Sequence, residues 1–171
     1  MKLTGALLIM FASTMLGFLQ AAQYAKRPRQ IRVLIQALQS LETEISYGLT
    51  PLPNALEKIG RNLEAPLSEL FTGAALQLCS RSGMSTREIW EGRIQALWPA
   101  TSLGADERAA MLRLGEHLGL SDREDQIKHI RLAMEQLKAE ETKARNDQLR
   151  YEKMWRSLGV LGGLLVVILL I

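Results

Sequence analysis

The sequence predicts an all-α protein, a six-helix cytoplasmic bundle flanked by N- and C-terminal transmembrane helices. Apolar runs with almost no charge occupy both ends of the chain, and the middle is polar. In the middle, apolar residues recur at steps of three and four, which is the period of an amphipathic helix. Strictly alternating runs bounded by turns are missing from the sequence, so no sheet is expected. We therefore divide the chain into a transmembrane helix (residues 1–25), a helical bundle (26–153) and a second transmembrane helix (154–171).

The N-terminal apolar run, LTGALLIMFASTMLGFLQAA, covers residues 3–22 without a charge. About 20 helical residues at ~1.5 Å each span the ~30 Å hydrocarbon core of a bilayer. A basic cluster follows the run and marks that side as cytoplasmic: Lys26, Arg27, Arg29 and Arg32. A secretory signal peptide is the alternative, because Lys2 precedes the run and small residues lie near Ala21 and Ala22. If the run were cleaved, the protein would be a secreted helical protein.

The C-terminal apolar run, LGVLGGLLVVILLI at residues 158–171, is short for a span, at about 21 Å of helix. Trp155 suits the membrane interface, and the stems of Lys153 and Arg156 can snorkel, so residues 154–171 are expected to cross a locally thinned bilayer. A half-inserted anchor is the alternative. Arg150 adds to the basic residues before this run and again marks the cytoplasmic side. Both termini are therefore expected outside the cytoplasm.

Small residues recur at four-residue spacing in both apolar segments, as Ser13 with Gly17 and Gly159 with Gly163. This spacing lets two membrane helices approach closely, so these residues are candidates for helix packing in the membrane. Glycine is also common in membrane helices without such a role.

The first bundle helix is predicted from an apolar stripe after Gln30: Ile31, Leu34, Ile35, Leu38, Leu41 and Ile45. Pro28 suits the first turn of a helix and restricts Arg27, so we expect a break or kink near Arg27. Gly48 is expected to end this helix. Thr50 is then the predicted cap of a second helix, which has Pro51 at its first position. The apolar face of the second helix is Leu52, Ala55, Leu56 and Ile59.

Four more helices follow. The third covers residues 67–78 and is ended by a turn at 80–83. The fourth opens with a capping box formed by Ser85 and Glu88 and stops before Pro99. The fifth starts near Ala105 and is expected to turn three residues inward: Ala109, Leu112 and Leu114.

The last helix is predicted to open with a second capping box at residues 121–124, which begins with Ser121. Its apolar stripe is Ile127, Ile130, Met134 and Leu137. Neither glycine nor proline interrupts residues 121–158. We therefore expect one continuous helix that runs into the membrane, about 76 Å long if it reaches the end of the chain.

Composition excludes several function classes. The formal net charge of +3 is small and dispersed, whereas nucleic-acid binding needs a clustered basic face. One cysteine, Cys79, allows no internal disulfide or CxxC motif and is expected to be a buried apolar residue. The sequence contains no phosphate-binding loop, nucleophile elbow, H-E-x-x-H or G-x-G-x-x-G motif. No enzyme activity and no cofactor are therefore predicted.

The titratable residues near the last two predicted helices are expected to have structural roles. His117 and His129 are assigned to different helices, and His117 lies at a glycine-rich helix end, where an imidazole most often caps carbonyl groups. Neither is assigned a metal or catalytic role. Asp122, Glu124 and Asp125 are explained by the helix macrodipole, which favours negative charge at an N-terminus.

Three segments closely resemble the stage III sporulation protein AB family: RPRQIRVLIQALQSLETEISYGLTPLPNAL, LGEHLGLSDREDQIKHIRLAMEQL and EKMWRSLGVLGGLL. The resemblance implies a six-helix cytoplasmic bundle held in the mother-cell membrane of an endospore former, within the trans-envelope complex that links mother cell and forespore. It also implies a partner, the secretion-type ATPase stage III sporulation protein AA. Residues 47–56 and 115–122 are more distantly similar to the type II secretion inner-membrane platform protein. That protein has two bundles and three spans, so its mechanism cannot be carried over.

Two functions are compatible with this organisation. The first is a scaffold that couples a cytoplasmic ATPase and other membrane subunits to a membrane complex. The alternative is a pore-lining or transport subunit, which the nearly uncharged apolar runs disfavour. The first and last bundle helices are both tied to the membrane, so their free ends are expected at one distal pole. Tyr47, Asp122 and Arg123 at this pole are the predicted partner-binding residues, although they could merely cap and close the turns.

Overall fold

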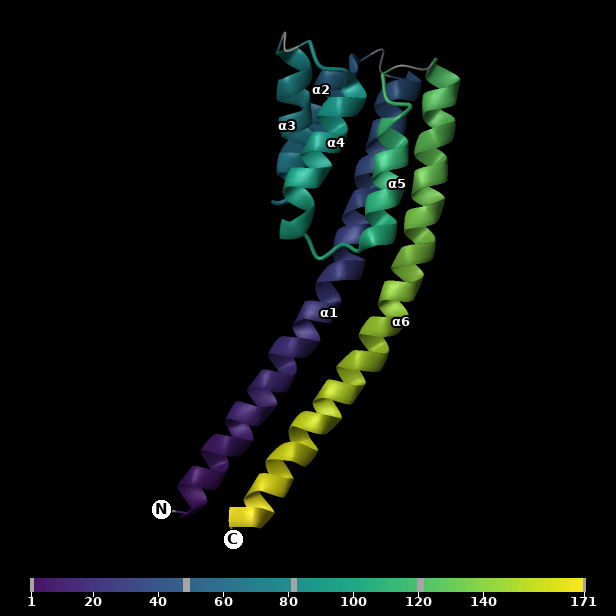
Figure 1. Cartoon of the computed structure of the whole chain (residues 1–171). Coiled ribbons are helices and arrows are strands. Elements are labelled where there is room, and N and C mark those ends of the chain that lie inside the picture. The colour runs from purple at the N-terminus through teal and green to yellow at the C-terminus, as the bar shows by residue number, and fades with distance from the viewer. Residues whose placement is uncertain (1, 48–49, 81–82, 120–121, 171) are drawn as a thin grey trace. The chain divides into compact units, whose positions relative to one another are not determined.

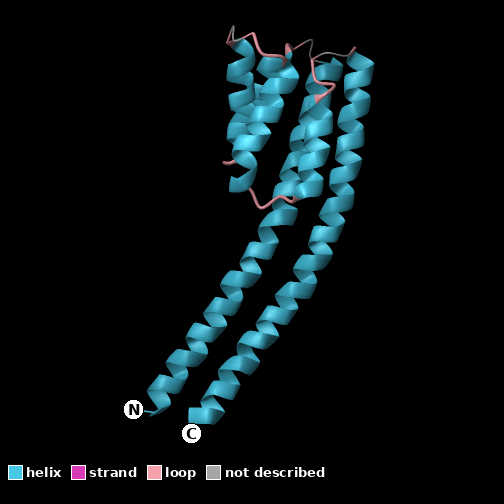
Figure 2. Cartoon of the chain, viewed as in Figure 1, coloured by secondary structure: helices cyan, strands magenta, loops and turns pink. Residues whose placement is uncertain are grey.

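A computed structural model describes residues 2–47, 50–80, 83–119 and 122–170. Every regular element within these ranges is helical (Figure 2). The elements in chain order are α1 (Lys2–Tyr47), α2 (Leu52–Arg61), α3 (Leu67–Cys79), α4 (Thr86–Leu97), the short 3-10 helix η1 (Trp98–Ala100), α5 (Ala105–Gly115) and α6 (Arg123–Leu170). The predicted all-α class with six α-helices is confirmed.

The chain forms two compact units. One unit combines Met1–Pro28 with Thr142–Ile171, and thus contains the first part of α1 and the last part of α6. The other unit, Arg29–Glu141, is the helical bundle. No helix within the described residues combines the length and apolarity needed to cross a membrane.

Helix α1 continues through Pro28, so of the break or kink predicted near Arg27 the break is wrong, and the kink stays a prediction. A proline inside a helix removes one backbone hydrogen bond and costs about 3 kcal/mol or more. The stripe that follows Pro28 offsets this cost, because Ile31 and Leu34 are fully buried in the bundle. Pro28 by itself favours an interruption of the helix, and the burial of Ile31 and Leu34 outweighs this preference.

The core of the bundle contains the predicted stripes of α1 and α6. Leu34, Leu38 and Leu41 are fully buried, and Ile45, nearer the helix end, is half-buried. On α6, three of the four predicted residues are buried: Ile130, Met134 and Leu137. The 3.6-residue period therefore identified the core-facing side of both helices.

Two ion pairs show how α1 and α6 lie against each other in the bundle. The Arg32 guanidinium is 2.7 Å from the Glu141 carboxylate, and Arg131 Nε is 2.7 Å from the Glu42 carboxylate. Arg32 and Glu42 are ten residues apart in α1, and their partners Glu141 and Arg131 are ten residues apart in the opposite direction in α6. The two helices are therefore antiparallel. The same register puts Tyr47, the last residue of α1, level with the first turn of α6. In Figure 1 these two helix ends lie at the same end of the bundle.

Trp90 joins α3, α4 and α5. Its indole N–H donates to the Met111 carbonyl at 2.7 Å, and its ring meets Phe71 edge-on at a centroid distance of 5.7 Å. Gly115 makes room for the indole, because a Cβ at this position would lie 2.3 Å from a Trp90 ring carbon. The short helices are therefore held by one large buried side chain with a satisfied polar group.

The starts of the short helices test the capping predictions. The Ser85–Glu88 capping box is confirmed, with Glu88 N–H donating to Ser85 Oγ at 3.2 Å and Ser85 N–H donating to Glu88 at 2.7 Å. The predicted cap at Thr50 is wrong. Pro51 occupies the N-cap position of α2 without a side-chain cap, and the Thr50 hydroxyl donates to the Glu44 carboxylate at 3.0 Å.

Two burial predictions also need correction. The inward face of α5 holds Ala110, Met111 and Leu114, whereas Ala109 and Leu112 are half-buried, so only Leu114 was correct. Cys79 is exposed rather than buried. It is the last residue of α3, and the buried stripe of this helix ends one turn earlier at Ala75.

Candidate functional site

The candidate site is the pole of the bundle where α1 ends and α6 begins. Tyr47 is 87% exposed, and Asp122 and Arg123 are exposed as well. Residues 48–49 and 120–121 lie outside the described residues, and with them the predicted roles of Gly48 and Ser121. The register of α1 and α6 brings the three predicted partner-binding residues to one end of the bundle.

Asp122 occupies the N-cap position of α6. Its carboxylate accepts a hydrogen bond from Asp125 N–H at 2.9 Å, and its carbonyl accepts one from Gln126 N–H at 3.0 Å. This is the bonding pattern of an N-cap residue, and replacing such an aspartate by alanine typically costs about 0.5–2 kcal/mol. Asp122 therefore stabilises the start of α6, whereas Tyr47 and Arg123 present exposed side chains.

A cluster of His117, Asp125 and His129 lies beside this pole. Asp125 and His129 are one turn apart on α6, and His117 follows the end of α5. His117 Nδ1 lies 3.5 Å from one Asp125 oxygen, and His129 Nε2 lies 3.4 Å from the other. The two imidazole rings stack with centroids 3.3 Å apart and planes at 5°. All three side chains are half-buried.

Sequence reasoning missed this cluster because it assigned the two histidines to separate helices and explained Asp125 by the macrodipole. Two signals were present. The D-x-x-x-H spacing puts Asp125 and His129 on one helix face. The short connection between α5 and α6 brings His117 back to that face. The three ligand atoms lie within 4.8 Å of one another and could hold a metal ion.

A cavity of about 200 Å³ opens beside the cluster, between α5 and α6. His117 and His129 line it together with Glu116 and the paired side chains of Arg113 and Gln136. The Arg113 guanidinium donates to the Gln136 side-chain oxygen at 2.8 Å. The cavity thus provides polar space next to the histidines.

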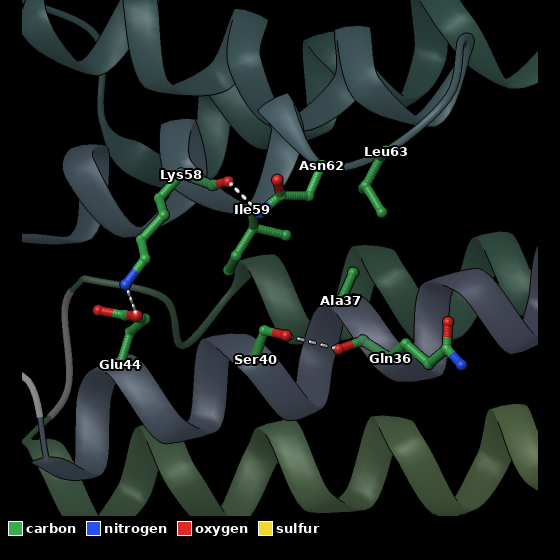
Figure 3. Close-up of a pocket in the computed structure, with 8 residues that line it drawn as sticks. All are labelled: Gln36, Ala37, Ser40, Glu44, Lys58, Ile59, Asn62 and Leu63. Atoms are coloured by element: carbon green, nitrogen blue, oxygen red, sulfur yellow. Dashed lines mark hydrogen bonds and ion pairs between the residues drawn. The ribbon is translucent and has the colours of Figure 1, made fainter.

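A second groove, of about 270 Å³, lies between α1 and α2 (Figure 3). Lys58 Nζ is 2.5 Å from the Glu44 carboxylate at one end of it. The hydrogen bond from Lys58, followed by that from Thr50, lowers the pKa of Glu44 from its ordinary value. This pair connects α2 to α1, and we assign it a structural role.

The four residues predicted to pack membrane helices fall in the terminal unit. Ser13 and Gly17 belong to α1, and Gly159 and Gly163 belong to α6. Their backbone is helical, but their surroundings are outside what the structure describes. Their packing role stays a prediction.

The architecture defines a class of protein: a small all-α bundle whose first and last helices continue into a second unit that contains both chain ends. Residues 2–171 match the family model described as stage III sporulation protein AB. The chain therefore belongs to the stage III sporulation protein AB family. It is 45% identical to stage III sporulation protein AB of Bacillus subtilis (strain 168), over 99% of both chains. A solved structure of stage III sporulation protein AB is 43% identical, covers 73% of this chain and 98% of its own, and has a TM-score of 0.68.

Proposed function

We propose that this protein is a non-enzymatic membrane platform subunit of the secretion-like complex between mother cell and forespore, and that it couples a cytoplasmic ATPase to this complex during endospore formation. Membership of a sporulation family supports the setting. The exposed pole formed by the end of α1 and the start of α6 supports the coupling role. The sequence lacks a phosphate-binding loop, so a partner would supply the energy.

Residues 1–25 and 154–171 are proposed as the membrane anchors. Both contain long apolar runs, and basic clusters separate both runs from the bundle. This arrangement would hold the bundle in the cytoplasm, on the mother-cell membrane that faces the forespore, with both termini on the other side. Ser13, Gly17, Gly159 and Gly163 would let the two anchors pack closely.

The proposed docking surface for the ATPase, stage III sporulation protein AA, is the pair Tyr47 and Arg123. Both side chains are exposed, and they lie at the end of the bundle opposite Arg29 and Glu141, where α1 and α6 leave it. Tyrosine and arginine are enriched among the residues that dominate protein–protein binding energy. Asp122 would contribute indirectly, because its capping bond fixes the first turn of α6.

A scaffold explains the apolar runs better than a pore subunit does. Residues 3–22 and 158–171 contain no ionisable side chain. Polar pathways through membranes usually require such groups. The expected partners are therefore the ATPase and the other membrane subunits of the same complex, and not a transported solute.

The experiment is a binding measurement between the detergent-solubilised full chain and purified stage III sporulation protein AA. The test variant is Tyr47→Ala/Arg123→Ala, which leaves the Asp122 cap in place. We expect at least a tenfold loss of affinity, which corresponds to about 1.4 kcal/mol or more. Thermal unfolding is measured on the same samples and should remain unchanged.

The matched control is Leu149→Ala/Arg150→Ala, which also removes one exposed apolar and one exposed basic side chain. Both residues belong to the part of α6 that lies outside the bundle. It should bind like the unmodified chain. Equal loss in both variants, or full binding by the pole variant, would contradict docking at the pole.

A further inference from the structure

We propose that His117, Asp125 and His129 form a binding site for a divalent transition metal of the zinc type, which would tie the turn after α5 to the first turns of α6. The proposal is independent of the membrane and ATPase roles. It rests on the convergence of three ligand side chains from two parts of the bundle.

The donor set selects the class of metal. Two imidazoles and one carboxylate suit zinc and its neighbours in the transition series, whereas magnesium and calcium prefer oxygen ligands. A site with three protein ligands leaves the fourth position of a tetrahedral zinc ion open to water. The cavity lined by His117 and His129 provides space for such a water.

The separations are close to those of a zinc site, and the ligand atoms lie within 4.8 Å of one another. Ligands at about 2.0–2.1 Å from a tetrahedral zinc ion lie about 3.3–3.4 Å from one another. The two nitrogen–oxygen separations in the cluster are 3.5 Å and 3.4 Å. Each histidine faces a different oxygen of Asp125, so one ion would be held by both oxygens together, or by one oxygen after a small shift of the other histidine.

One feature must change on binding. A metal lies in the plane of each imidazole that ligates it, and two parallel planes 3.3 Å apart cannot share one ion. At least one ring would therefore rotate away from the stacked arrangement. Loss of the stacking is a specific consequence of the proposal, because an ion that only screened the charge of Asp125 would leave the two rings parallel.

Two neighbours oppose the ion. The start of α6 carries the positive end of the helix dipole, and the Arg113 guanidinium lines the adjacent cavity. We therefore expect weaker binding than at a closed four-ligand structural site. The site would still stabilise the bundle, because a ligand that binds only the folded state raises the unfolding temperature.

The test uses the full chain without a polyhistidine tag, in detergent and freed of metal by a chelator. The background is Cys79→Ser, because the exposed thiol of Cys79 is itself a zinc ligand. Calorimetric titration with Zn²⁺ should show one ion per chain, and saturation should raise the unfolding temperature by about 5–10 °C. Mg²⁺ at the same concentration should bind at least tenfold more weakly.

The variants His117→Gln and His129→Gln should each weaken Zn²⁺ binding at least tenfold while the metal-free protein unfolds at an unchanged temperature. Co²⁺ gives an independent readout, because a tetrahedral site produces strong visible absorption that both variants should lose. One-to-one binding that survives both substitutions, or absence of Zn²⁺ binding, would overturn the proposal.

A measurement on the unsubstituted histidines keeps the proposal testable if the variants fold poorly. Carbethoxylation by diethylpyrocarbonate is followed in the Cys79→Ser background with and without Zn²⁺. Both histidines should be protected by the ion, because its ligand nitrogens become unavailable. Equal modification rates in the presence and absence of Zn²⁺ would contradict the site.

Discussion

The two parts of α1 form one helix from two different sequence patterns. Residues 3–22 carry no charge and are mostly apolar, whereas the bundle part has buried residues such as Leu34 and Leu38 on one face and exposed ones such as Arg32 and Gln36 on the other. The same contrast recurs in α6, where residues 158–170 are apolar and the part before Glu141 carries a single buried stripe. Both patterns form a helical backbone. The bundle pattern requires other helices against one face, whereas the apolar pattern requires an apolar environment around the helix.

This comparison separates what stabilises the bundle from what is proposed to anchor it. The bundle part of α1 gains stability by burying one face against other helices. The apolar runs have no comparable polar face, so a lipid environment is the proposed solvent for them. Changes in the first pattern should therefore alter unfolding, and equal changes in the second should not.

The largest expected effect is that of Leu38→Ala. Leu38 is fully buried, and removing a buried leucine side chain to alanine costs about 2–5 kcal/mol. Urea unfolding of the detergent-solubilised chain, followed by circular dichroism, measures the loss. Leu8→Ala in the apolar run is the matched control and should change the unfolding midpoint little. Equal loss of stability in both variants would show that the apolar run contributes to unfolding stability as much as the bundle part of α1 does.

Gly115→Ala should destabilise the bundle by about 1–3 kcal/mol, the usual cost of overpacking. The added Cβ would lie 2.3 Å from Trp90, whose position is fixed by its bond to Met111 and its contact with Phe71. Gly92→Ala is the control, because a Cβ there meets nothing within 4 Å and alanine favours a helix. Thermal melts should show opposite shifts. A neutral Gly115→Ala would mean that Trp90 can move aside.

Asp122→Ala should cost about 0.5–2 kcal/mol, because it removes the side-chain bond to Asp125 N–H at the start of α6. Asp122→Asn should cost only a few tenths, since asparagine caps nearly as well. Hydrogen exchange localises the effect, and the first turn of α6 should lose protection. Equal exchange in the alanine and asparagine variants would show that the Asp122 side chain does not cap α6.

The smallest effect is the pH dependence from Glu44. Its pKa is below the ordinary value of 4.5 in the folded protein, first because of Lys58 and then Thr50. A depressed carboxyl pKa contributes stability that is fully present above the unfolded value, so this contribution is lost as the pH falls through the folded pKa. Unfolding measured from pH 7 to pH 3 should show a shallower decline in Glu44→Gln. Identical slopes would assign the acid sensitivity to other carboxylates.

Sequence periodicity identified the helices and most of the core because buried positions such as Leu41 and Leu137 obey the 3.6-residue period. The Ser85 cap was also readable, because a capping box depends only on residues three apart. The failures at Pro28 and Thr50 have a tertiary cause: packing continued one helix, and Glu44 accepted the hydroxyl that would have capped another.

The pole could be predicted from connectivity, since the first bundle helix and the last one were both expected to be tied to the membrane, which puts their free ends at the same end of the bundle. The histidine cluster could be predicted only in part: the spacing of Asp125 and His129 puts them on one helix face, whereas the approach of His117 to Asp125 depends on tertiary structure. Periodicity also overestimated burial at Cys79, where the helix reaches its end before the stripe meets a neighbour. Local patterns thus specified the elements, and long-range contacts specified the site.

The most direct test of the proposed membrane platform is the topology of the chain in intact cells. Single cysteines are introduced as Lys2→Cys or Ile171→Cys in a Cys79→Ser background, and the unmodified chain reports from Cys79, which is exposed in the bundle. An impermeant thiol reagent applied from outside should label both terminal cysteines and should reach Cys79 only after the membrane is permeabilised. Labelling of Cys79 in intact cells with the termini protected would contradict a cytoplasmic bundle anchored at both ends.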